Sequence, residues 1–157
     1  MDNQDKIVID ELTKLLLGGS AHISLQDALE GLQPRLRDIK PDHMPYSIRQ
    51  LVEHIRIAQW DMLQFCRDAE YKSPKWPDEY WPKESAPEDE DAWNGALSQI
   101  NSDLDEFIEL MEHGDLYLKI PHGEGQTILR EALQIADHNA YHIGEIVAIR
   151  RILGDWK

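Results

Sequence analysis

Hydrophobic residues recur at the 3.6-residue period of an α-helix in four long segments of this chain. The segments cover about 3–17, a stretch that begins at Ser47, a stretch that ends near His113, and about 127–153. A short piece after Asp115 alternates as a strand does, but a single short strand has no partner to pair with. The pattern therefore predicts an all-α protein, built as a four-helix bundle.

The segments between these helices are long and contain residues that interrupt helices. A short extra helix is expected after Ser24 and before Pro34. The stretch 71–87 holds four prolines and two tryptophans, so irregular structure is expected there. Ser85 and Glu88 match a capping box, which places the start of the third long helix at this point. The predicted bundle thus has long connections.

Composition and charge fit one globular domain over residues 1–157. Hydrophobic residues make up 41% of the chain, which suits a folded core. Sixteen basic residues against 30 acidic ones give a formal charge of −14, which argues against nucleic acid or an anionic membrane as partner. The single cysteine, Cys66, lies in an apolar helical stripe and is expected to be a core thiol. With no basic N-terminal region and no apolar span, a cytoplasmic location is expected.

Two histidines four residues apart are the most informative chemical feature of the sequence. His138 and His142 share one face of the fourth predicted helix, because residues four apart are neighbours on an α-helix. Two imidazoles placed in this way can bind one divalent transition metal. The alternative is that both are solvated surface residues. Their neighbours Ile135, Ile146 and Ile149 are apolar, which favours the metal site.

A third ligand is expected from another helix. His54 lies at the border of the apolar stripe of the second helix, where a lone histidine is more often a hydrogen-bonded core residue. Together with the pair on the fourth helix, however, it completes a three-histidine set, which leaves coordination positions open for water or substrate. The other four histidines fall in predicted loops or at helix ends, where surface roles are expected: His22, His43, His113 and His122.

Two carboxylates are candidate catalytic groups. Glu145 lies one turn beyond His142 on the same helix face. A carboxylate there can be a fourth metal ligand, a hydrogen-bond partner of a ligand, a base, or a solvated residue without a role. Asp61 lies two turns from His54 and can be a partner or an acid/base group. The sequence excludes a zincin, because no Glu follows His138, and the usual di-iron bundle, because no Glu-x-x-His occurs.

At this point the chain resembles the DinB / YfiT-like superfamily. The resemblance rests on His54, on the later motif His138-x3-His142-x-Gly144-Glu145-Ile146, on Pro45-Tyr46-Ser47-Ile48 and on the ending Arg150-Arg151-Ile152-Leu153-Gly154. It implies an up-down-down-up bundle, often a homodimer, with a divalent metal such as zinc or nickel on His54, His138 and His142. One departure is Glu145, where the family commonly has Gln.

The resemblance also implies a function. Characterised members include metal-dependent transferases and isomerases that use small thiols such as bacillithiol, mycothiol or glutathione. We therefore expect a transferase in which a metal-bound thiolate attacks a small-molecule electrophile at an open site. One alternative is a hydrolase in which metal-bound water needs Glu145 as its base, and another is a non-catalytic, stress-associated metal- or ligand-binding bundle. The loop with Trp76 and Trp81 either covers the cleft or packs against the bundle.

Overall fold

Amphipathic helices make up most of the chain. The computed structural model describes residues 3–18, 21–82 and 89–156, and within them the chain forms five α-helices and no strand. Four are long: α1 (Asn3–Leu17), α3 (Ile48–Arg67), α4 (Glu90–His113) and α5 (Ile128–Ile152). The fifth, α2 (Leu25–Leu29), is the short helix expected after Ser24, and a 3₁₀ turn covers Pro34–Leu36. The predicted all-α bundle is confirmed.

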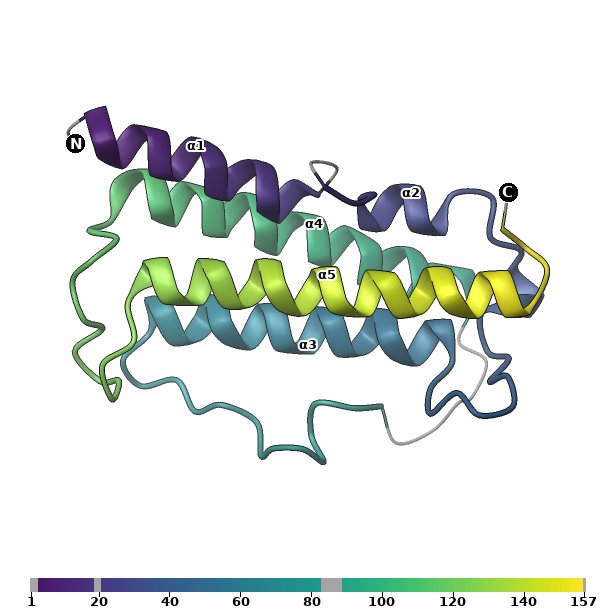
Figure 1. Cartoon of the computed structure of the whole chain (residues 1–157). Helices are drawn as coiled ribbons and strands as arrows, with labels where there is room; N and C mark the ends of the chain where they lie inside the picture. Colours follow the sequence, from purple (N-terminus) through teal and green to yellow (C-terminus); the bar gives the residue numbers. More distant parts are fainter. Residues whose placement is uncertain (1–2, 19–20, 83–88, 157) are drawn as a thin grey trace.

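The long helices lie side by side in an up-down-down-up arrangement (Figure 1). In Figure 1, α1 and α5 run from left to right, whereas α3 and α4 run from right to left. Because α3 and α4 are parallel, the chain between them has to return along the length of α3. We call this segment, residues 68–89, the crossover. Its described part, residues 68–82, runs along the α3 side of the bundle and contains three of the four prolines of the proline-rich stretch.

Side-chain caps fix where the helices begin. Ser47 accepts a hydrogen bond from the backbone N–H of Gln50, and the Gln50 side chain accepts one from the backbone N–H of Ser47, which is the predicted capping box. Thr127 caps α5 by a single bond, since its hydroxyl accepts from the backbone N–H of Arg130. Asp89 caps α4, whereas the capping box predicted at residues 85 and 88 lies outside the described residues.

The core is formed mainly by α3, α4 and α5, and α3 packs against both of the others. Each fully buried aliphatic or aromatic side chain contributes roughly 1.5–3 kcal/mol. The largest fully buried hydrophobic side chains are Phe107, Ile48, Leu51, Ile55, Leu63, Ile100, Met111, Ile135, Ile146 and Ile149. Seven of these ten belong to α3 or α5, the helices that carry the candidate ligands, so the ligands stand on a well-packed part of the core.

The connection between α4 and α5 differs slightly from expectation. The strand-like piece was expected to lack a partner, but Lys119 forms a single antiparallel bridge with Thr127. The backbone N–H of Ile120 donates to the carbonyl of Gln126 at 2.8 Å. The partner of Lys119 therefore lies at the end of the same connection, and not in a second strand elsewhere in the sequence.

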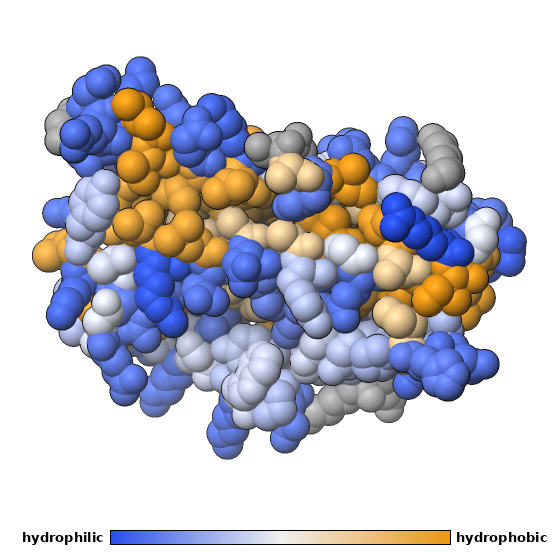
Figure 2. Space-filling view, viewed as in Figure 1, coloured by the Kyte–Doolittle hydropathy of each residue, from blue (hydrophilic) through white to orange (hydrophobic). Residues whose placement is uncertain are grey.

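Apolar side chains also reach the surface. Figure 2 shows an apolar band over α1 and α5. On these helices the exposed large hydrophobic residues are Ile7, Leu15, Leu17, Leu133, Tyr141 and Ile152. Among the described residues, every helix is too short or too polar to cross a membrane.

Candidate metal centre

Three histidines meet between α3 and α5. His54 comes from α3, and His138 and His142 come from successive turns of α5. The Nε2 atoms of His54 and His138 are 3.0 Å apart. One ligand nitrogen from each of the three side chains lies within 4.8 Å of the other two. The structure therefore brings together the three residues that the sequence singled out.

Helix geometry explains the arrangement. The rings of His138 and His142 are 4.5 Å apart between centroids, as expected for residues one turn apart on the same face. The ring of His54 lies 4.8 Å from His138 and 4.7 Å from His142. Burial is uneven, since His54 is 1% exposed, His142 is 7% exposed and His138 is half-buried. The open side of the cluster is therefore next to His138.

Each histidine has an oxygen atom facing its Nδ1. The carbonyl of Tyr80 accepts from Nδ1 of His54 at 2.8 Å, and the Glu145 carboxylate accepts from Nδ1 of His142 at 2.7 Å. The third contact, between His138 Nδ1 and the side-chain oxygen of Asn139, is longer at 3.4 Å. A carbonyl or carboxylate oxygen can only accept, so Nδ1 of His54 and Nδ1 of His142 each carry a proton. In both rings Nε2 is therefore the atom left to bind a metal.

Burial also keeps two of these rings neutral. It lowers the pKa of His54 to about 4, although the hydrogen bond to Tyr80 acts in the opposite direction and the nearby His142 adds to the lowering. The pKa of His138 is likewise lowered to about 4 by burial and by the neighbouring His142 and His54. At neutral pH both rings are therefore in the unprotonated form that binds metals.

The donor set fits a divalent transition metal. The Nε2 atoms of His54 and His138 face each other at 3.0 Å, a separation that suits either a hydrogen bond between the rings or a metal ion bound by both. Nitrogen ligands of a tetrahedral zinc ion lie roughly 3.3 Å apart, because each Zn–N bond is about 2.0–2.1 Å. Among the described residues, no Cys, Asp or Glu joins the three histidines in this group. Three imidazole nitrogen donors suit zinc, nickel, copper or iron better than magnesium or calcium.

Aromatic rings cover His54 from the crossover side. Trp81 stacks on His54 with centroids 3.7 Å apart and an interplanar angle of 8°. Tyr46 stacks on the other face of Trp81 at 3.6 Å and 10°. Trp76 is tilted at 6.5 Å from His54 and is 71% exposed. Of the two tryptophans that the sequence analysis left open, Trp81 therefore packs on the centre and Trp76 remains largely in solvent.

Asp61 is connected to the centre through Tyr80. The Tyr80 hydroxyl donates to Asp61 Oδ2 at 2.6 Å, while the Tyr80 carbonyl accepts from His54. Burial and this hydrogen bond to Asp61 raise the pKa of Tyr80. Tyr80 thus links the crossover to two positions of α3. Sequence reasoning missed it, because a tyrosine in a proline-rich stretch gives no signal about which helix it contacts.

The remaining histidines lie away from the cluster and are exposed. Three of them contact backbone carbonyls: His22 contacts Ile23, His113 contacts Glu109 and His122 contacts Phe65. The fourth, His43, adopts a positive φ of 68°. These side chains provide natural controls for substitutions at the cluster.

Comparison with known proteins identifies one family. A family model described as the DinB superfamily matches residues 22–146, a span that includes all three clustered histidines and Glu145. Comparison with curated proteins and with solved structures finds no match.

Proposed function

Since the chain belongs to the DinB superfamily, we propose that His54, His138 and His142 bind one divalent transition metal, zinc or nickel. We further propose that the protein is a metal-dependent transferase that uses a low-molecular-weight thiol. The metal site is supported most directly by the arrangement of the rings: each Nδ1 faces an oxygen atom, and one nitrogen of each ring lies close to the other two. The thiol transferase is supported by the family.

A divalent ion bound there supplies Lewis-acid chemistry, because it lowers the pKa of a coordinating thiol and favours the nucleophilic thiolate. The chain's own residues provide the surroundings. Trp81 and Tyr46 exclude water from one side of His54, and the Tyr80 carbonyl fixes the orientation of that ring. Three protein ligands leave coordination positions for a small-molecule substrate. The half-buried His138 marks the side from which it enters.

Glu145 acts in this proposal as a positioning residue. Its carboxylate is hydrogen-bonded to Nδ1 of His142, which orients the ring and increases the basicity of Nε2. Asp61 acts one step further away, by holding Tyr80 through its hydroxyl. In this proposal neither carboxylate transfers a proton.

The two alternatives have less support. A hydrolase needs a free base near the open positions, and Glu145, its candidate base, is engaged with His142. A purely structural metal site usually has four protein ligands, whereas the group among the described residues has three.

Metal content tests the site. We expect one zinc or nickel ion per chain in untagged protein by elemental analysis, and loss of that ion in His54→Ala and His138→Ala. The matched controls His22→Ala and His122→Ala remove exposed histidines and should keep the metal. One metal ion per chain in His54→Ala or His138→Ala would rule out the proposed ligand set.

Activity tests the reaction. Metal-loaded protein is incubated with glutathione, bacillithiol or mycothiol and a panel of electrophiles, and loss of free thiol is measured. We expect turnover with at least one pair in the wild type and none in His138→Ala. A fully metal-loaded protein that turns over no thiol, but hydrolyses activated esters, would favour the hydrolase alternative instead.

A further inference from the structure

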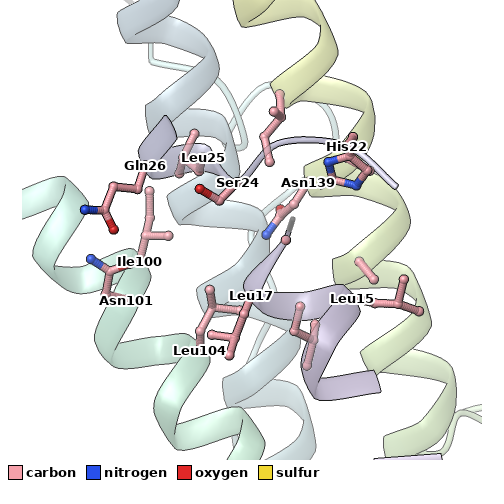
Figure 3. Close-up of a pocket in the computed structure, with 15 residues that line it drawn as sticks. Leu15, Leu17, His22, Ser24, Leu25, Gln26, Ile100, Asn101, Leu104 and Asn139 are labelled. Atoms are coloured by element: carbon pink, nitrogen blue, oxygen red, sulfur yellow. The ribbon is translucent and has the colours of Figure 1, made fainter. Parts of the chain in front are cut away.

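A cavity of about 180 Å³ lies between α1, α2, α4 and α5, and no described residue of α3 lines it. It is therefore distinct from the cluster that contains His54, although Asn139 both lines the cavity and contacts His138. Figure 3 shows Gln26 and Asn101 at one edge of the cavity and His22 at the other, with Leu17 and Leu104 between α1 and α4. Nothing in the proposed transferase reaction uses this space.

The size of the cavity suits a small organic molecule. An engineered apolar cavity of about 150 Å³ binds benzene, and the volume here is slightly larger. Most of the wall is aliphatic, including three consecutive leucines at the end of α1 and two alanines of α5, Ala136 and Ala140. Because the alanines are one helical turn apart, they leave a hollow on one face of α5. An apolar ring or a short chain fills such a hollow.

Polar groups are present at the edges, but none of those described is permanently charged. Among the described residues that line the cavity there is no Lys, Arg, Asp or Glu. Gln26 and Asn101 also line an adjoining groove of about 300 Å³. Among the described residues that line this groove, Glu30 is the one with a carboxylate. Asn139, which is buried, donates to Gln59 at 2.9 Å. Side-chain amides can donate to and accept from a neutral hydroxyl or amide.

The charges disfavour an anionic ligand. The lining offers no permanent cation, the adjoining groove contributes a carboxylate, and the chain carries a formal charge of −14. A buried carboxylate without a partner is costly. We propose that this cavity is a second binding site, which takes an uncharged amphiphile: a single aromatic ring or short aliphatic chain with one hydroxyl or amide group.

The experiment uses 4-fluorobenzyl alcohol as the probe and 4-fluorobenzoate as its charged counterpart, in fluorine NMR titrations of the full chain. We expect saturable one-to-one binding of the alcohol, and binding of the benzoate that is at least about tenfold weaker because its charge has no partner. Equal affinity for both, or no saturable binding of the alcohol, would overturn the proposal.

Substitutions locate the binding. Ala140→Leu and Ala136→Leu each fill the hollow and should weaken the alcohol at least about tenfold. Ala92→Leu, the same change at an exposed position of α4, should have no effect. Circular dichroism and metal content show whether each of these two variants folds. One folded variant is enough for the test. Alcohol affinity unchanged in a folded filled variant would contradict the assignment.

The two sites can be separated in the same experiment. His54→Ala removes a metal ligand and should keep the affinity for the alcohol, whereas Ala140→Leu should keep the metal. If neither the wild type nor Ala140→Leu binds metal, the proposed function is contradicted, whereas the inference of a second site still stands. Loss of alcohol binding in His54→Ala would show that the probe sits at the metal centre and would overturn the second site.

Discussion

At the scale of single residues, the orientation of each histidine ring in the centre depends on the oxygen atom that faces its Nδ1. For His142 this oxygen belongs to Glu145. We expect Glu145→Ala to weaken metal affinity about 10- to 100-fold, as is typical when a ligand loses its hydrogen-bond partner. Glu145→Gln keeps an acceptor oxygen and should lose much less. Competition titrations with a chromogenic chelator measure both, and equal losses in the two variants would contradict a positioning role.

A second prediction at this scale concerns Asp103 of α4, which is 6% exposed and whose Oδ2 has no hydrogen-bond partner among the described residues. Burial raises its pKa from about 3.8 to about 6, and Glu106 adds to the increase. Between these values the folded chain binds more protons than the unfolded chain. Its free energy of unfolding therefore falls, through this group, as the pH rises from about 4 to about 6.

Asp103→Asn removes this cost. We expect it to raise the free energy of unfolding by about 1–2 kcal/mol at pH values well above 6, with little effect near pH 4. Urea unfolding at the two pH values measures the difference, and Asp105→Asn, on an exposed position of the same helix, is the control. A less stable Asp103→Asn at neutral pH would mean that attraction to Arg56 and Arg67 outweighs burial.

The ligand residues were predictable from the sequence, whereas their partners were not. His138 and His142 are one turn apart on a helix, so local spacing alone puts them together. His54 required the apolar stripe of a second helix and the family resemblance. Tyr80, in the crossover, accepts a hydrogen bond from His54 through its carbonyl. Tyr46 reaches the centre only by stacking on Trp81. Irregular backbone has no period, so no sequence pattern indicates which of its side chains turns inward.

At the scale of elements, the crossover is attached to α3 by Tyr80, whose carbonyl and hydroxyl contact different residues. We expect Tyr80→Phe to lower the free energy of unfolding by about 1–3 kcal/mol, because a buried oxygen of Asp61 loses its donor. Metal content should stay at the wild-type value, since the carbonyl remains.

Thermal or urea unfolding and elemental analysis measure these two effects separately. Tyr141→Phe, which removes a hydroxyl from an exposed side chain, is the control. Loss of metal in Tyr80→Phe without loss of stability would place the hydroxyl in the metal site itself.

Helix boundaries were more predictable than the segments between helices. Ser24, Ser47 and Thr127 cap α2, α3 and α5 through bonds made within four residues, so the sequence contains the whole signal. The bridge between Lys119 and Thr127 depends on how the whole connection folds back.

At the scale of the whole molecule, two properties act in opposite directions on association. Apolar residues of α1 and α5 are exposed, including Ile7 and Leu133, while the formal charge of −14 makes copies of the chain repel each other. We propose a homodimer through this apolar band, whose dissociation constant falls as ionic strength rises, because salt screens the repulsion. Sedimentation velocity at low and high salt measures it.

Substitution locates that interface. Leu133→Glu places a further negative charge in the band and should shift the chain to a monomer. Leu118→Glu makes the same change at an exposed position of the connection before α5 and should leave the dimer intact. A chain that is monomeric at every salt concentration, or a Leu133→Glu variant that still forms the wild-type dimer, would exclude this interface.

The length of the crossover has a consequence of its own. A helix of 20 residues such as α3 is about 30 Å long, and about nine extended residues are enough to span that distance. Residues 68–89 supply more than twice as many. The parallel course of α3 and α4 thus requires a return, but only the surplus chain allows it to bend inward and place Trp81 on His54. A crossover shortened to that minimum would still connect α3 and α4 in the same bundle, but it would leave His54 without Trp81 above it. The length of the crossover can therefore change the solvent exposure of the centre without changing the packing of the four helices.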